Sequence, residues 1–327
     1  MNIDISKIVG EKRHGLIPIV AMLLLFLVAV AVIMESEYHP PMEGKSQVAS
    51  ASDTRDEFAE LDIKAVAAIV VDLKNGKVLY EKNQNVQLPL ASLAKIALAL
   101  AVDDVLPADT VITISRDTAP KGSAERLAKG DAWRVKDVID FTLVSSSNEG
   151  AEILANASNR AIPAKYPYAP EDFAAIWRMN EFAKQLGLKQ TFFLNASGLD
   201  ISPTLSGAYG SARDVATLFG YAASERLPVF ASTAEDGVIL TSANGRSTAR
   251  AFNTNEALGD IPGLMMGKTG ITDLAGGNLA VVFDAGLTHP VVAVVLGSTR
   301  EGRFSDIRQI VTEVRNVLSE QNLTSAN

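Results

Sequence analysis

Three short clusters of polar residues have the types and spacing that nucleophilic catalysis needs. The first is Ser92 and Lys95, in the otherwise apolar stretch LASLAKIALAL. Residues three apart share a helix face, so the lysine amine can reach the serine hydroxyl. A serine attacks poorly without a base, and burial lowers the pKa of a lysine until its amine accepts a proton. The pair predicts a nucleophile with its base; the alternative is a lysine that extends to the surface.

The second cluster is Ser146, Ser147 and Asn148, in LVSSSNEGAE, after an apolar helical segment. The hydroxyl of Ser146 and the carboxamide of Asn148 would relay a proton and hold a substrate amide. The alternative is an ordinary helix N-cap, because serine and asparagine are preferred at that position.

The third cluster is Lys268, Thr269 and Gly270, in LMMGKTGITDL on an expected strand. The lysine and the threonine would bind a substrate carboxylate. Gly270 would let a substrate backbone approach closely, as glycines in strands often do. The alternative is the solvated end of a strand.

The elements that must position these clusters follow from hydrophobic periodicity. Apolar β-rich runs lie at both ends of the domain, and one pair flanks Asn75-Gly76, a strong hairpin signal. Helical patterns fill residues 120–235 and return at 303–319. The β-rich runs are residues 66–71, 77–80, 279–283 and 291–296. We expect an α+β fold: one antiparallel sheet built from both ends, a helical lobe beside it, and a site in the cleft between them.

An uncharged run of 19 residues, 16–34, is long enough to cross a bilayer as a helix. The residues before it are basic and those after it are acidic, so the positive-inside rule places the N-terminus in the cytoplasm. The charged neighbours are Lys7, Lys12, Arg13, Glu35 and Glu37. A retained transmembrane anchor is the preferred interpretation; a cleaved signal peptide and a buried core helix are the alternatives.

The expected organisation has five parts. Residues 1–15 form a cytoplasmic N-terminus and 16–34 the anchor. Residues 35–60, which are polar and contain two consecutive prolines, form a flexible tether. The catalytic domain then covers 61–321, and 322–327 form a tail.

Composition excludes several classes of protein. The net charge of −8 argues against a nucleic-acid partner. The chain has no cysteine, which excludes disulfides, thiolate zinc sites and cysteine nucleophiles. Its histidines, His14, His39 and His289, do not fit a Ser-His-Asp triad, and no H-E-x-x-H motif supports a metallopeptidase.

The order S-x-x-K, S-x-N, K-T-G, with the first after a hairpin and the last on a strand, is typical of serine–lysine acyl-transfer enzymes. The chain resembles the D-alanyl-D-alanine carboxypeptidase family of low-molecular-weight penicillin-binding serine peptidases, over about residues 60–320. Further stretches resemble the family in the same order: VDLKNGKVLYEKNQNVQLPLASLAK, FFLNASGLD, GSARDVATL, FNTNEALGDIPGLMMGKTGITDLAGGNLAVV and GSTREGRFSDIRQIV.

The resemblance implies a role for each residue. Ser92 would attack the carbonyl between the two D-alanines, with Lys95 as the acylation base. Ser146 would relay a proton to the leaving amine, and Asn148 would hold the acyl side chain. The backbone N–H groups of Ser92 and Ile271 would form the oxyanion hole.

The same resemblance assigns the substrate-binding residues. Lys268 would bind the terminal carboxylate and help to lower the pKa of Lys95, and Thr269 would add a hydroxyl to the carboxylate contact. Arg303 matches a family arginine that recognises the carboxylate. For Arg303, a surface position at a helix N-terminus is an equal alternative.

The sequence departs from the family in three places. Ala94 precedes Lys95 where threonine is common, and Glu149 follows Asn148 where aspartate is usual. Neither change removes a catalytic group. Thr254 replaces a common basic residue, which puts substrate contacts there in doubt.

The family also implies the fold, partners and location. The fold would be that of serine β-lactamases and DD-peptidases, and no cofactor is expected. The substrate would be a peptidoglycan stem peptide ending in D-Ala-D-Ala, with β-lactam antibiotics as inhibitors. The catalytic domain would lie outside the cytoplasmic membrane of a bacterium.

Rival functions remain within and beyond the fold. A D,D-endopeptidase would use the same residues, and a non-catalytic wall-binding module would keep the fold. A class A β-lactamase needs an E-x-x-L-N glutamate, which is absent between 150 and 210.

Overall fold

The structure is a computed structural model that describes residue 58 and residues 61–118, 126–286 and 288–325. The chain divides into two units, 1–54 and 55–327, and all described residues belong to the second. The expected anchor at 16–34 and most of the expected tether therefore lie outside the described residues. In the described part, no helix is long and apolar enough to cross a membrane.

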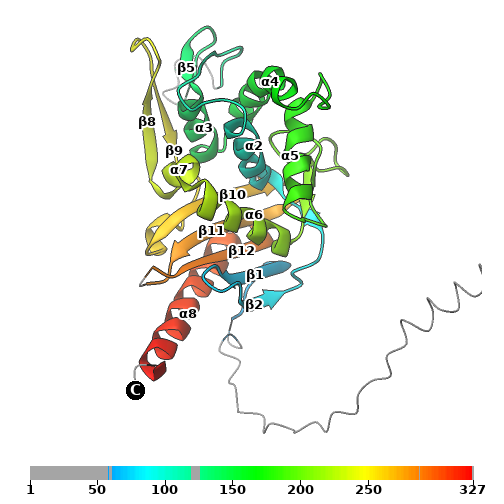
Figure 1. Ribbon diagram of the computed structural model, residues 1–327. Coiled ribbons are helices and arrows are strands. Elements are labelled where there is room, and N and C mark those ends of the chain that lie inside the picture. The colour runs from blue at the N-terminus through cyan, green and yellow to red at the C-terminus, as the bar shows by residue number, and fades with distance from the viewer. Residues whose placement is uncertain (1–57, 59–60, 119–125, 287, 326–327) are drawn as a thin grey trace, which may run out of the picture. The chain divides into compact units, whose positions relative to one another are not determined.

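A five-stranded antiparallel sheet joins the two ends of the domain, as the sequence predicts (Figure 1). Its strand order is β10-β11-β12-β1-β2. The strands are β1 (Ala67–Asp72), β2 (Val78–Lys82), β10 (Leu264–Thr272), β11 (Gly276–Asp284) and β12 (Pro290–Ser298). The first strand thus pairs with the last one, and β10, which carries the third polar cluster, lies at the sheet edge.

Both faces of the sheet are buried, so its central strands are mostly apolar. Successive residues of β12 alternate between two separate cores: Val292 and Val294 face one, and Val291 and Val295 face the other. This alternation is the two-residue period of a strand. One core contains α8 (Gly302–Ser325), and the other contains α6 (Ala212–Glu225) and the helical lobe. Figure 1 shows α8 and the lobe on opposite sides of the sheet.

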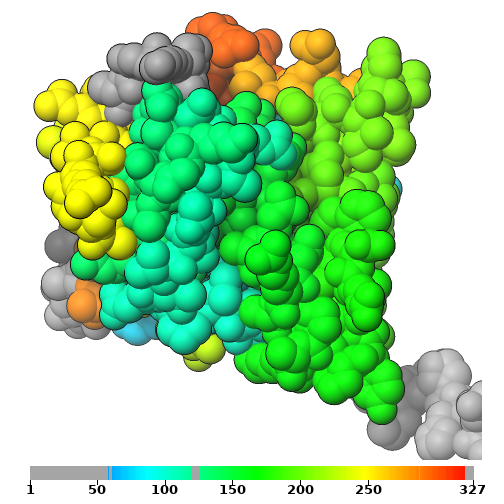
Figure 2. All heavy atoms as spheres, turned by 90° about the horizontal axis from the view of Figure 1, so that it is seen from above, coloured from blue at the N-terminus to red at the C-terminus, as the bar shows by residue number. Residues whose placement is uncertain are grey.

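The lobe is built around α2 (Ala94–Asp103), of which every residue from Ala94 to Val102 is buried. A helix that is apolar on all sides is stable only when other elements surround it. The surrounding elements are α3 (Val135–Val144), α4 (Asn148–Lys165), α5 (Ala174–Gln185) and α7 (Leu227–Phe230). Figure 2 views this lobe from above, with the hairpin of β8 (Gly237–Thr241) and β9 (Thr248–Phe252) at one edge.

Short elements complete the fold, and some differ from the expectations. The 3-10 turn η2 (Ala91–Leu93) precedes α2, and η3 (Ala231–Ala234) and η4 (Leu258–Asp260) lie before β10. The sequence reading missed five of the short strands, and also β8 and β9, because short, half-exposed strands carry little periodicity. The short strands are β3 (Leu88–Pro89), β4 (Val111–Thr113), β5 (Ala132–Arg134), β6 (Phe192–Phe193) and β7 (Ala208–Gly210). The last helix also continues past the expected end at 319, to Ser325.

Asp306 ties α8 to the sheet, and we expect its loss to be costly. Its buried carboxylate accepts hydrogen bonds from the backbone of Lys64 and Ala65, at 3.0 and 2.9 Å, and from the Ser298 hydroxyl at 2.7 Å. Asp306→Ala leaves these donors unpaired, which should lower the free energy of unfolding by about 2–4 kcal/mol. Urea unfolding of the full chain measures it. Glu313→Ala, on the same helix, should change it by under about 0.5 kcal/mol; equal losses would contradict the assignment.

Candidate active site

The amine of Lys95 lies at the centre of the site. It contacts the Ser92 hydroxyl at 2.8 Å, the Asn148 side-chain oxygen at 2.9 Å and the backbone oxygen of Ser197 at 2.8 Å. The Lys95 side chain is fully buried, so the surface alternative is wrong. The structure thus brings together the first two polar clusters. It adds a contact between Lys95 and the backbone oxygen of Ser197 that the sequence did not predict.

The three contacts suit a neutral lysine. The oxygens of Asn148 and Ser197 only accept hydrogen bonds, so they use the two N–H groups of a neutral amine. The remaining lone pair then faces Ser92, whose hydroxyl donates its proton to it. Burial lowers the pKa of Lys95 to about 7, against a smaller opposing effect of the Glu149 carboxylate. Near neutral pH, therefore, Lys95 exchanges between the protonated form and the form that serves as a base.

Ser92 sits in a tight turn with unusual backbone geometry. Ala91, the residue before it, has a φ of 49°, in the left-handed region that disfavours side chains. The backbone N–H of Leu90 donates to Ala208 of β7 at 2.9 Å, which fixes the start of this turn. Such outliers persist only where the surroundings enforce them. Here the turn places the Ser92 hydroxyl beside Lys95.

Ser197 and Gly198 hold the nucleophile turn from the lobe side. Gly198 has a φ of 76°, and a Cβ there would overlap the backbone oxygen of Ala91. Only glycine allows this approach. The approach brings the Ser197 oxygen to Lys95. The stretch FFLNASGLD contains the glycine, but its sequence carries no signal for which backbone oxygen meets the lysine.

The second cluster contains the N-cap of α4 and two residues that contact the buried lysines. Ser147 is the N-cap of α4 and accepts from the N–H of Gly150 at 3.0 Å. Ser146 and Asn148, on either side of it, are therefore left for the site. Ser146 has a φ of 57°, and its hydroxyl accepts from the Lys268 amine at 2.7 Å.

Lys268 is buried on β10 and forms the second lysine–serine pair. Its amine also donates to the backbone oxygen of Thr269 at 2.9 Å. Burial, followed by the positive charges of Lys95 and Arg303, lowers the pKa of Lys268 well below its usual value. Burial is also the main cause of the lowered pKa of Lys95. Repulsion between the two lysines acts on both of them, so the expected contribution of Lys268 to the pKa of Lys95 stays a prediction.

Gly270 permits a close approach, but to a different partner than expected. A Cβ on Gly270 would lie 2.9 Å from the Leu90 oxygen and 3.3 Å from the Ser92 nitrogen. The chain's own nucleophile turn, and not a substrate backbone, therefore occupies the space beside this glycine. The same approach brings the N–H of Ser92 near the segment of β10 that continues to Ile271, the two groups expected to form the oxyanion hole.

Two more side chains support the K-T-G strand. The hydroxyls of Thr254 and Thr269 lie 2.6 Å apart, so Thr254, at the family's basic position, contacts the strand directly. Arg303 is 5% exposed, which rules out a surface position, and it donates to the backbone oxygen of Gly270 at 2.8 Å. Its Nε is buried and has no hydrogen-bond partner among the described residues.

The arrangement holds a hydroxyl group, a neighbouring amine that can act as its base, and two further basic side chains in one place, and it suits acyl transfer to a substrate with a carboxylate. In the described ranges, no cluster of three or more His, Cys, Asp or Glu side chains is arranged to hold a metal ion.

Known proteins are similar to this chain in both sequence and fold. The sequence profile of the D-alanyl-D-alanine carboxypeptidase family matches residues 51–300. A D-alanyl-D-alanine carboxypeptidase of Mycobacterium tuberculosis is 33% identical over 72% of this chain and 75% of its own. A D-alanyl-D-alanine endopeptidase of Escherichia coli is 28% identical over 88% of this chain and 86% of its own.

Solved structures agree. The ampicillin-bound penicillin-binding protein D2 of Listeria monocytogenes superposes with a TM-score of 0.63 and 29% identity, over 77% of this chain and 98% of its own. The structure of a D-alanyl-D-alanine carboxypeptidase of Mycobacterium tuberculosis superposes with a TM-score of 0.64 and 27% identity, over 77% of this chain and 91% of its own. These similarities confirm the expected α+β DD-peptidase fold. The chain belongs to the D-alanyl-D-alanine carboxypeptidase family, peptidase family S11.

Proposed function

We propose that this protein is a serine-type D-alanyl-D-alanine carboxypeptidase that acts on peptidoglycan stem peptides and is inhibited by β-lactams. The observation that carries the proposal is the buried Lys95 amine, which lies 2.8 Å from the Ser92 hydroxyl and has no carboxylate partner in the described chain. This geometry makes Ser92 a nucleophile with its own base. The family match supports the choice of substrate.

Acylation follows from the contacts. Ser92 Oγ attacks the carbonyl carbon between the two D-alanines while Lys95 accepts the hydroxyl proton. The N–H groups of Ser92 and Ile271 would stabilise the oxyanion. The C–N bond then breaks, and the leaving amine takes a proton from Lys95 or through Ser146. Water hydrolyses the ester and frees Ser92.

Substrate recognition falls to the residues around β10. An arriving carboxylate favours the charged form of Lys268, because an opposite charge raises the pKa of a lysine. Thr269 would donate its hydroxyl, oriented by Thr254 at 2.6 Å, and Arg303 would add its positive charge from behind the strand. Asn148 keeps its NH₂ group free of hydrogen bonds to described residues and would hold the acyl part of the peptide.

A D,D-endopeptidase is the second candidate. The relative from Escherichia coli that carries this name matches over 86% of its length, and the same catalytic groups would serve both reactions. The intact site does not favour a non-catalytic wall-binding module.

We propose further that residues 16–34 anchor the protein in the cytoplasmic membrane, with residues 1–15 inside and the catalytic domain outside. The support is the uncharged run with basic residues before it and acidic residues after it.

Covalent labelling tests the nucleophile. A fluorescent penicillin should label the wild-type full chain and Ser224→Ala, an exposed serine on α6, but not Ser92→Ala. Release of D-alanine from a pentapeptide should fall by a factor on the order of 10⁴ or more in Ser92→Ala. No labelling of the folded wild type would exclude this mechanism. Release of D-alanine from the pentapeptide would indicate a carboxypeptidase. Cleavage of cross-linked dimers alone would indicate an endopeptidase.

The rate of acylation by penicillin should rise with pH and level off, with its midpoint near the Lys95 pKa of about 7, because only the neutral amine is a base. The Glu149 carboxylate favours the charged amine, so Glu149→Gln should move the midpoint to lower pH. Stopped-flow acylation between about pH 5 and 9 measures it. Glu152→Gln is the matched control, since Glu152 pairs with Arg116 and should leave the midpoint in place. A flat profile, or an upward shift in Glu149→Gln, would contradict the assignment.

Membrane attachment has its own test. The full chain should stay in the membrane pellet after an alkaline carbonate wash, and a chain without residues 1–35 should be released. Protease added outside spheroplasts should digest the catalytic domain. A mature protein whose first residue follows position 34 would instead show that the segment is a cleaved signal peptide.

A further inference from the structure

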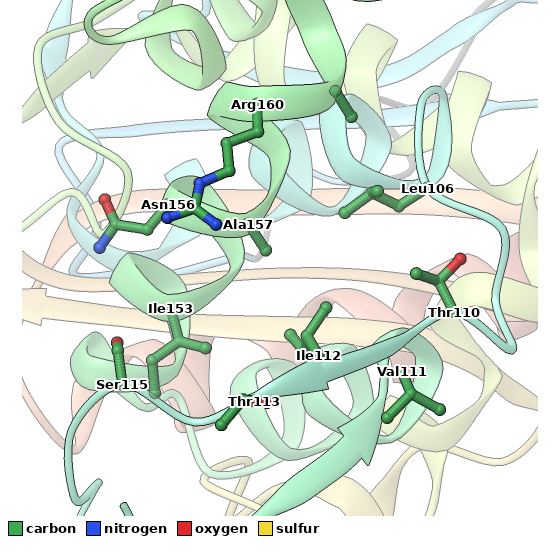
Figure 3. Close-up of a pocket in the computed structure, with 11 residues that line it drawn as sticks. Leu106, Thr110, Val111, Ile112, Thr113, Ser115, Ile153, Asn156, Ala157 and Arg160 are labelled. Carbon is green, nitrogen blue, oxygen red and sulfur yellow. The ribbon is translucent and has the colours of Figure 1, made fainter. Parts of the chain in front are cut away.

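A groove lies on the helical lobe, between β4 and α4 (Figure 3). Its volume is about 550 Å³, within the usual range for ligand sites. None of the groups assigned to catalysis lines it. At the usual spacings of strands and layers, this volume admits roughly three residues of extended chain.

One wall of the groove is the free edge of a strand. In the described sheets β4 pairs only with β5. Thr110 and Ile114, which flank β4, make their backbone hydrogen bonds toward the β5 side, with Val135 at 2.8 Å and Asp131 at 2.8 Å. In an antiparallel pair these bonds alternate along the strand. The N–H and C=O groups of Val111 and Thr113 therefore point away from β5, toward α4.

The other wall carries a cation that has no counter-ion among the described residues. Arg160 projects from the exposed face of α4 beside Asn156, as Figure 3 shows. Within the described ranges, neither side chain has a hydrogen-bond or ion-pair partner. Glu152, two turns earlier on α4, already pairs with Arg116. A guanidinium in this position suits bidentate binding of a carboxylate.

The floor of the groove is aliphatic. Leu106, Ile112, Ile153 and Ala157 lie between the two walls, and the described residues of the lining include neither an acidic nor an aromatic side chain. Such a floor fits methyl-sized side chains. A free strand edge, a small aliphatic floor and an unpaired guanidinium together describe the complement of a short extended peptide with small side chains and a free carboxylate.

We propose that this groove is an accessory, non-catalytic site for the peptide of peptidoglycan, which adds to β4 as a third strand and places its terminal carboxylate on Arg160. The identity of the peptide rests on the proposed function, since a stem peptide that ends in D-Ala-D-Ala has both the methyl side chains and the carboxylate. A stem peptide held in this groove keeps the enzyme on the peptidoglycan polymer while Ser92 acts on the end of another stem peptide.

The test separates this groove from the active site. The full chain in detergent is first acylated with penicillin G, and mass spectrometry counts the esters at Ser92. Calorimetric titration with diacetyl-L-lysyl-D-alanyl-D-alanine should then still show saturable binding. Arg160→Gln should weaken it about tenfold, the loss expected for one charge-assisted pair. The C-terminal amide of the same peptide should bind equally weakly to both chains, and Arg246→Gln, an exposed arginine of the β8–β9 turn, should bind like the wild type.

A substitution in the free edge of β4 provides an independent test of peptide binding. Thr113→Pro removes one outward N–H and should also weaken binding, while its rate of penicillin acylation stays at the wild-type value and reports an intact fold. Absence of saturable binding to the acylated chain, or equal affinities for wild type and Arg160→Gln, would overturn the proposal. So would a concentration-dependent dimer that Thr113→Pro abolishes in a chain that binds no peptide, since the edge would then serve self-association.

Failure of the proposed function has a different signature. It appears at the first step, as a folded chain without a penicillin ester at Ser92. The titration is then run on the unacylated chain, and the dependence on Arg160 decides the fate of the groove in the same way.

Discussion

The buried amine of Lys95 is the constraint on which the rest of the site depends. Moving an amine out of water is costly unless its hydrogens and lone pair find partners. Here the partners are oxygens from the turn before α2, the start of α4 and the loop at Ser197. Burial lowers the pKa of Lys95 to about 7, and because no carboxylate is among these partners, the neutral form is accessible near neutral pH. The lobe must bring three separate segments to one atom, and the base results from that packing.

Close backbone contacts on two sides fix the nucleophile turn. On the lobe side Gly198 lies against the oxygen of Ala91, and on the sheet side Gly270 lies against Leu90 and Ser92. Each contact exists because a Cβ is missing. Between the two glycines, Ala91 is held in a left-handed conformation that an isolated chain would avoid. The strain is therefore maintained by the junction of sheet and lobe.

The two lysines differ in their surroundings and divide the work. The hydrogen-bond partners of the Lys95 amine are all oxygens, and the Glu149 carboxylate raises its pKa. Lys268 faces Lys95 and Arg303, two positive charges, so it gains most from an incoming carboxylate. In the proposed mechanism, the substrate carboxylate would bring a negative charge next to Lys268. That carboxylate would leave the Lys95 amine free to act on Ser92.

The sequence by itself determined the three polar clusters, their order and the main element beside each, although Ser92 lies in the 3-10 turn before α2 and not in the helix itself. A three-residue spacing on a helix, a serine-rich helix start and a strand glycine are local features, so local sequence can specify them. The sheet that joins strands from both ends of the domain was also predicted, from the apolar β-rich runs at those ends. These runs sufficed because strands buried on both faces are apolar throughout.

Only the tertiary structure decided which alternative held at each position. It left the capping of α4 to Ser147 and buried Arg303 behind β10. It also brought the Ser197 oxygen to Lys95, and it filled the space beside Gly270 with the chain's own turn. Every residue type supplies a backbone oxygen, so the sequence does not mark the one that contacts Lys95. Burial depends on which distant segments pack over a side chain. Contacts between residues about a hundred positions apart leave no trace in local periodicity, and the pKa of Lys95 depends on them.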